Sequence, residues 1–451
     1  MNKNFVFTIV FFIISYFMVR LPFLIDPLIN EEGTHAFVFC CNPPSPKYLW
    51  IATINGEDQF DVPQHPALIY ETLGLFGAPW GAIINNSRGE NPLLTSFLTR
   101  FAFTLFQFSY FLLLIILLRK SENVIWRKRM IWVVIALSLA PIAIYTSISV
   151  QVDGSVGSFF PGLVALSLLA RHENLLQPKW ALTSLFVSSA ILGFGKNEWG
   201  LALLLSVILT GIFILLARGF YQKHDGLLTD FAPLGIIIAG LIAGNLINYL
   251  YDPKNYLGGF FLIRGLSAYK SDMSTATMLT ERIKFLYLNF LMVILICGGV
   301  ILALRKKVET MLLLTFIWGS MLFFAYFVTH WGWLLKRYYA PSFVVITIGV
   351  IIALKYYPKR VAQYISIALI AISLIGTLFS AGSRLDRLKE YSFLFTPPAT
   401  LQNQDQSLDS CVPLLNDGEV FTNGIKEFIS GSVGETNGEK IANKFGKSIC
   451  K

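Results

Sequence analysis

About eleven apolar runs, separated by short polar segments, divide this chain of 451 residues and constrain its fold more than any other feature. A helix that crosses the hydrocarbon core of a bilayer needs about 20 predominantly apolar residues. Several runs are shorter, and those at 156–170 and 180–193 cross only if the helices tilt or the bilayer thins locally. The pattern predicts an all-α polytopic membrane protein with spans near residues 5–19, 97–118, 130–148, 156–170, 180–193, 199–216, 231–250, 285–304, 310–328, 340–354 and 361–379.

Composition and charge support a membrane class and argue against a nucleic-acid partner. The chain is 55% hydrophobic and 14% charged, whereas soluble proteins are about one quarter charged. The net charge is +9, but the basic residues fall in short clusters between the apolar runs. Such clusters are typical of loops at an anionic membrane surface rather than of a nucleic-acid-binding patch. We therefore expect membrane lipids, and no nucleic acid, among the partners.

The basic clusters also predict an orientation. If the N-terminus is cytoplasmic and the runs alternate, the short loops near residues 119–129, 171–179, 218–223, 305–307 and 355–360 are all cytoplasmic and all basic. This is the positive-inside pattern. The opposite side then holds a large first loop (residues 20–96), a middle loop (251–284), an aromatic turn (329–339) and the polar tail. We expect a transmembrane catalytic domain at 1–380 and a small extracytoplasmic C-terminal segment at 381–451. Cys411 and Cys450 bracket that tail, where an oxidising compartment would permit a bond between them.

The first loop carries adjacent carboxylates just past the first span. Glu31 and Glu32 lie in Asn-Glu-Glu-Gly, and a carboxylate held beside a substrate hydroxyl serves as a general base. A solvated acidic turn is the alternative. Further along the loop, His65 can hydrogen-bond a carboxylate, ligate a metal or cap the helix that follows Pro66. No second histidine lies nearby in the sequence, which weakens the metal interpretation.

Four other charged residues fall on the same predicted side. Lys196 lies between two apolar runs and can bind a phosphate as a point charge, or pair with Glu198. Arg337 follows an aromatic belt and can bind a phosphate with two N–H groups. Arg264 in the middle loop is a further cation. Asp153 precedes an apolar run, where it shapes a pocket or is stabilised by the helix dipole.

Carboxylates and cations gathered at one membrane face suit transfer from a lipid-linked sugar phosphate. Cations would hold the phosphate and stabilise it as it leaves, and a carboxylate would take the proton of the attacking hydroxyl. A phosphate leaving group needs little protonation, so a single base suffices, unlike the two-carboxylate arrangement of glycosidases.

With these residues in view, the chain resembles the GT-C superfamily of integral-membrane glycosyltransferases. The nearest branch contains protein O-mannosyltransferases and aminoarabinose transferases of lipid A. The resemblance covers about the first 350 residues, and its segments occur in the family's order. They are Arg20-Leu21-Pro22 at the start of the first loop, Glu31-Glu32-Gly33 for Asp-Glu-Gly, His65-Pro66-Ala67-Leu68 for His-Pro-Pro-Leu, Arg100 opening the second span, Asp153 before a Phe-rich helix, Lys196 for the Lys of Gly-x-x-x-Lys, and Arg337-Tyr338 before a proline.

The resemblance implies a GT-C-like bundle and inverting transfer from a polyprenyl-phosphate-sugar donor to a glycan, lipid or protein acceptor. It implies Glu31 as the base, with Glu32 beside it, and Lys196, Arg337, Tyr338, Asp153, His65 and Arg264 around the substrate. An undecaprenyl carrier would place the protein in a bacterial cytoplasmic membrane. Some family members bind a divalent metal and others do not, so no cofactor is assigned. Glu31 in place of Asp and Ala67 in place of Pro are departures from the family pattern.

A membrane transporter or lipid flippase is the alternative from another class. Such proteins place functional charges near the middle of the bilayer, often on broken helices. Here the charges lie at the ends of the predicted spans, and the span centres are nearly free of charge. This distribution favours chemistry at the membrane surface. A structural protein without chemistry would not need carboxylates and cations clustered on one side.

Overall fold

The computed structural model describes residues 3–26, 76, 92–150, 152–195, 197–221, 227–251, 253, 286–330 and 339–394. Every regular element in these ranges is helical. The elements are α1 (Lys3–Met18), α2 (Leu21–Leu24), α5 (Pro92–Leu118), α6 (Val124–Leu139), α7 (Pro141–Ile148), the π-helical η2 (Val152–Val156), α8 (Gly157–His172), α9 (Pro178–Phe194), α10 (Asn197–Tyr221), α11 (Leu227–Tyr251), α14 (Leu286–Leu304), α15 (Val308–His330), α16 (Ala340–Tyr356), α17 (Lys359–Gly382) and the 3₁₀ segment η4 (Leu385–Leu394).

The helices confirm a multi-pass, all-α membrane protein. Among the described residues, five are long and apolar enough to cross a bilayer, namely Ser96–Leu118, Gly154–His172, Trp199–Gly219, Phe231–Tyr251 and Lys359–Gly382. The bent pair α6 and α7 makes a sixth candidate. Shorter apolar helices lie at Asn4–Met18, Phe290–Leu304, Thr310–Ser320 and Ala340–Tyr356. A helix overlaps each predicted run, while the count of eleven spans stays a prediction.

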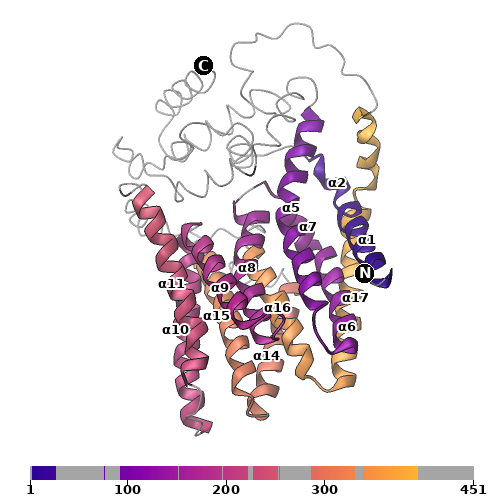
Figure 1. Ribbon diagram of the computed structural model, residues 1–451. Helices are drawn as coiled ribbons and strands as arrows, with labels where there is room; N and C mark the ends of the chain where they lie inside the picture. Colours follow the sequence, from indigo (N-terminus) through magenta and orange to yellow (C-terminus); the bar gives the residue numbers. More distant parts are fainter. Residues whose placement is uncertain are drawn as a thin grey trace.

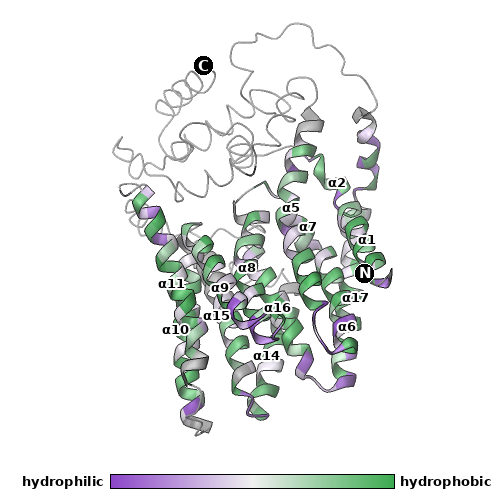
Figure 2. Cartoon of the chain, viewed as in Figure 1, coloured by the Kyte–Doolittle hydropathy of each residue, from purple (hydrophilic) through white to green (hydrophobic). Residues whose placement is uncertain are grey.

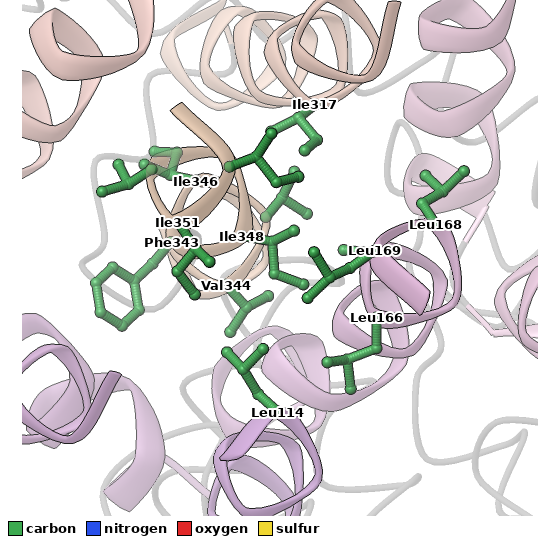
Figure 3. Packing of buried hydrophobic residues seen from close by; sticks show 14 of the residues in the cluster. Leu114, Leu166, Leu168, Leu169, Ile317, Phe343, Val344, Ile346, Ile348 and Ile351 are labelled. Atoms are coloured by element: carbon green, nitrogen blue, oxygen red, sulfur yellow. The ribbon is translucent and has the colours of Figure 1, made fainter. Parts of the chain in front are cut away.

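Two groups of helices flank a central pair (Figure 1). Helices α1, α5, α6, α7 and α17 form one group, and α9, α10, α11, α14 and α15 form the other, while α8 and α16 contact both. Every residue of α16 from Ala340 to Leu354 is buried. Figure 3 shows its side chains packed against those of α5, α8 and α15. By contrast, α17 lies at the rim and exposes Leu378 and Phe379, as expected of a face that contacts lipid (Figure 2).

Glycines set the spacing between α9 and α11. A Cβ added at Gly240 would lie 2.6 Å from the carbonyl oxygen of Phe186, and one at Gly244 would lie 2.0 Å from that of Ala190. Small residues at a helix interface let two backbones approach closely, which is how helices associate in lipid. These two glycines therefore permit the tight α9–α11 pair, which no larger residue at either position would allow.

The predicted third span is broken. Residues 130–148 form two helices that meet at Pro141 with a bend of 59°. Proline lacks an amide hydrogen and ends the backbone ladder of α6. At the break, the carbonyl oxygen of Ser138 accepts from Arg20 Nη2 (2.9 Å), and that of Leu139 accepts from Thr377 Oγ1. Side chains of two other elements thus replace hydrogen bonds that an unbroken helix would supply itself.

The basic end of the bundle is joined by charged contacts. Lys355 Nζ, in the last turn of α16, pairs with Glu173 Oε2 after α8 (2.6 Å). It also lies 5.7 Å from the ring centroid of Trp126 in α6. Arg127 donates to the carbonyl oxygens of Arg119 and Ser121. The ends of α6, α8 and α16 therefore meet on one face, and its position in the cytoplasm stays a prediction.

Candidate functional site

Most of the predicted site residues lie outside the described residues, namely Glu31, Glu32, His65, Lys196, Arg264, Arg337 and Tyr338. For Asp153 the backbone alone is described, within η2. The structure does describe the elements that bracket these residues. The first loop is bracketed by α2 and α5, Lys196 by α9 and α10, and Arg337 by α15 and α16.

Arg20 anchors the start of the first loop. It lies between α1 and α2 in the sequence, and its side chain is fully buried. Nε donates to Ser147 Oγ (2.7 Å), Nη1 to the Tyr16 carbonyl oxygen (2.8 Å), and Nη2 to the carbonyl oxygen of Ser138 (2.9 Å) and to Gln107 Oε1 (3.3 Å). The guanidinium also lies 3.4 Å from the centroid of the Tyr16 ring. Oriented acceptors and the negative end of α6 thus compensate for the lost hydration of the charge.

Gln107 extends this polar network across the bundle. Its Nε2 donates to Thr146 Oγ1 (2.8 Å) and Ser158 Oγ (3.0 Å), while its Oε1 accepts from Arg20 and from the Tyr16 hydroxyl (3.3 Å). One side chain therefore connects α1, α5, α7 and α8. Because buried polar groups are costly unless paired, this connected set fixes how the four helices sit relative to one another.

Arg100 joins the start of the first loop to the segment that carries Asp153. Its Nε donates to the carbonyl oxygen of Asp26 (2.8 Å), and its Nη1 donates to that of Ile148 (2.7 Å) at the C-terminal end of α7. A cation is favoured at a helix C-terminus. Arg100 lies four residues into the apolar span Ser96–Leu118, within α5, which begins at Pro92.

The turn from α7 into α8 depends on Gly154. This residue has φ −83° and ψ −111° inside η2. A Cβ there would lie 2.7 Å from Ser149 Cβ, closer than two unbonded carbons approach. The close approach brings Gly154 against Ser149, which follows the last residue of α7. It also fixes where the backbone of Asp153 lies, next to α5, α8 and α16.

An apolar cavity of about 40 Å³ opens between α8, α9, α10, α15 and α16. Its walls are almost wholly apolar, and they are formed by Pro161, Val164, Ala165, Leu192, Trp199, Ala202, Leu203, Phe316, Ile317, Ser320, Pro341, Ser342 and Val345. The volume admits roughly three water molecules or a stretch of one hydrocarbon chain. Two of these wall residues closely follow predicted site residues in the sequence: Lys196 lies three residues before Trp199, and Arg337 lies five before Ser342.

Two of the residues that line this cavity have buried donor atoms without partners among the described residues. Trp199 and Ser342 are each 2% exposed, and neither the indole Nε1–H nor the hydroxyl has a hydrogen-bond partner in that part of the chain. A buried donor left unpaired costs about 1–3 kcal/mol. Each of the two atoms has less than 1 Å² of accessible surface, so both lie behind the wall of the cavity and not on it.

Comparison of the chain with protein-family models, with curated proteins and with solved structures found no match in any of the three. Within the described ranges, no group of three or more His, Cys, Asp or Glu side chains is placed to hold a metal ion.

Several residues that the structure brings into the candidate site were not predicted from the sequence. Asp26 lies only five residues before Glu31. An acidic side chain at the boundary of a predicted span could have identified it as a candidate. Trp199 was assigned only to a span, although a tryptophan three residues after a cationic candidate is typical of a site near the membrane interface. Gln107 is a polar side chain within an apolar run, which inside a membrane commonly marks an internal network.

Proposed function

We propose that this protein is an inverting glycosyltransferase that moves a sugar from a polyprenyl-phosphate donor to a glycan, lipid or protein acceptor at the extracytoplasmic membrane face. The observation that carries the proposal is the apolar cavity, two of whose wall residues follow Lys196 and Arg337 closely in the sequence. The order of motifs that resemble GT-C glycosyltransferases supports the same activity.

The cavity suits one part of such a donor. Its apolar walls favour a hydrocarbon chain over a free sugar or a nucleotide. A lipid that shifts the side chain of Trp199 or Ser342 would offer the unpaired indole N–H or hydroxyl an oxygen at its polar end. Lys196 and Arg337, which precede these residues, would then neutralise the phosphate. A lipid phosphate satisfies all three features at once, because it joins an apolar chain to an anionic group.

In the proposed reaction, Glu31 takes the proton of the acceptor hydroxyl while the hydroxyl oxygen attacks the anomeric carbon of the sugar. The bond between that carbon and the phosphate oxygen breaks on the opposite side, which inverts the configuration. Polyprenyl phosphate leaves with the electron pair, held by Lys196 and Arg337. Glu32 is the second candidate for the base. Asp153 and His65 would organise the pocket, while Tyr338 and Arg264 would contact the substrate.

A transporter or flippase is the second candidate, and one observation favours it. Broken helices and buried charges mark the binding sites of transporters, and the break between α6 and α7 lies beside the buried Arg20. The contacts of Arg20 weaken this interpretation, because its guanidinium binds four acceptors of the protein itself. A cation engaged in this way stabilises the break and is not available to a substrate.

The test is transfer of labelled sugar from a panel of polyprenyl-phosphate donors by the purified protein, with Glu31→Gln beside the wild type. We expect the wild type to consume one donor and Glu31→Gln to lose at least a hundredfold in kcat, since general-base catalysis contributes about 10²–10⁴-fold. Glu122→Gln is the matched control, because Glu122 is exposed at the basic end of the bundle.

Each outcome separates the candidates. Equal consumption by wild type and Glu31→Gln would move the base to Glu32 or Asp153 while keeping the enzyme. No consumption of any donor, together with lipid or solute movement across proteoliposomes, would replace the glycosyltransferase with the transporter.

A further inference from the structure

Asp26, at the start of the first loop, holds two arginines of the C-terminal segment η4 and the turn before it. Its Oδ2 accepts from Arg384 Nη1 (2.6 Å), and its Oδ1 accepts from Arg387 Nη1. The Asp26 side chain is 21% exposed, and those of the arginines are 37% and 27% exposed. One carboxylate therefore binds two guanidiniums in a partly dehydrated place, where charge-assisted hydrogen bonds are strongest.

Three more contacts join this C-terminal segment to both ends of the first loop. The Tyr391 hydroxyl donates to the carbonyl oxygen of Leu21 (2.6 Å) in α2. The guanidinium of Arg384 lies 4.8 Å from the centroid of the Phe23 ring, also in α2. The ring of Tyr391 meets that of Phe97 in α5 edge to face at 5.8 Å. Because α2 lies at the start of the first loop and Phe97 directly follows its end, η4 contacts the chain at both ends of that loop.

These contacts bear on the proposed site because Asp26 is close to Glu31 in the sequence. Glu31 lies five residues after Asp26, so its Cα is at most about 18 Å away even in an extended chain. The backbone of Asp26 is held independently, through its carbonyl oxygen, by Arg100. Arg100 of α5 thus holds Asp26 to the end of α7, and the Asp26 carboxylate joins η4 to the same position. This position lies five residues before the predicted base.

We propose that η4 and the turn before it act as a brace, meaning that their contacts with Asp26, α2 and α5 hold the ends of the first loop in place. Asp26, Arg384 and Arg387 are then positioning residues for Glu31. The inference rests on the proposed function for the role of Glu31. Loss of the brace would displace the base without changing its chemistry, and a displacement of about 1 Å can cost a hundredfold in rate. Binding of the donor phosphate would change little, because Lys196 and Arg337 belong to other segments.

The test compares Asp26→Asn and the double variant Arg384→Gln/Arg387→Gln with the wild type, in the full-length protein. Asp26→Glu keeps the charge and serves as the conservative variant. Asp386→Asn and Lys389→Gln are matched controls, because both residues are exposed on η4 between or beside the two arginines. Two readouts are measured: hydrogen exchange of peptides from α2, η4 and the start of α5, and kcat and KM for the polyprenyl-phosphate donor.

We expect faster exchange in both α2 and η4 and a 10- to 100-fold lower kcat in Asp26→Asn and in the double arginine variant, with the donor KM within about twofold of wild type. Asp26→Glu should recover most of the kcat, and the two controls should match wild type. Unchanged exchange, or faster exchange with an unchanged kcat, would overturn the brace as a positioning device.

The exchange readout also separates failure of the brace from failure of the proposed function. If the wild type consumes no donor, the glycosyltransferase proposal fails, yet exchange still reports whether Asp26 couples η4 to the loop ends. Coupled loss of protection in α2 and η4 would then support the brace, and loss confined to η4 would overturn it.

Discussion

At the scale of the residue, Arg20 shows how a charge is held inside a membrane protein. All four of its bonds go to neutral oxygens from α1, α5, α6 and α7, and its guanidinium covers the ring of Tyr16. The motif Arg20-Leu21-Pro22 predicts the start of the first loop, but the arginine acts as an internal connector. Its position was predictable, whereas three of its partners were not, because Gln107, Ser138 and Ser147 lie 87 to 127 positions away.

Replacing Arg20 with methionine tests this role. Arg20→Met fills a similar volume but leaves Ser138, Ser147 and Gln107 without their donor. We expect a loss of about 1–3 kcal/mol in the free energy of unfolding, because buried acceptors are left without their donor. Denaturant unfolding of the protein in detergent measures the loss. Arg305→Met is the control, since exposed surface changes stay within about 0.5 kcal/mol. Equal stability of both variants would show that the network carries no net energy.

At the scale of the element, apolar length and backbone chemistry decided what could be predicted. Each span must satisfy its own backbone hydrogen bonds in lipid, so a long apolar run predicts a helix at its own position. The prediction treated residues 130–148 as one run despite Pro141, and the structure has two helices there. Proline breaks in membrane helices persist where neighbours re-pair the freed carbonyls, and those neighbours, Arg20 and Thr377, are distant in the sequence.

Helices α9 and α11 supply a prediction at this scale. In Gly244→Ala the added Cβ would lie 2.0 Å from a backbone oxygen of α9, which cannot rotate away. The helices must separate, and we expect a cost of about 1–3 kcal/mol or more. Gly235→Ala on the same helix is the control, because a Cβ there meets nothing within 4 Å and alanine is the better helix former. Thermal unfolding in detergent should rank Gly244→Ala below wild type and Gly235→Ala at or above it.

At the scale of the whole molecule, the arrangement of helices depends on information that the runs do not contain. Helices α11 and α16 are both long runs of mostly apolar residues in the sequence. In the fold, the first lies at the rim and the second is buried along its length. An apolar helix suits lipid and protein equally well, so composition cannot choose between them. For the same reason the cavity, which five helices line, was not predictable. The cationic residues Lys196 and Arg337, which precede its wall residues Trp199 and Ser342 in the sequence, were identified from their positions between runs.

The cavity carries the last prediction, which separates binding from stability. Trp199→Phe removes the indole N–H and keeps an aromatic ring. Because that donor has no partner among the described residues, the variant loses only the packing of the larger ring, which should lower the free energy of unfolding by about 0.5–3 kcal/mol. Affinity for a polyprenyl-phosphate donor should fall about two- to tenfold, which corresponds to one lost hydrogen bond of roughly 0.5–1.5 kcal/mol. Trp318→Phe is the matched control: its buried indole also lacks a described partner, but it does not line the cavity. Equal donor affinity in both variants, measured by titration against the wild type, would mean that the cavity does not bind the donor, whereas a loss confined to Trp199→Phe would assign the unpaired N–H to a ligand.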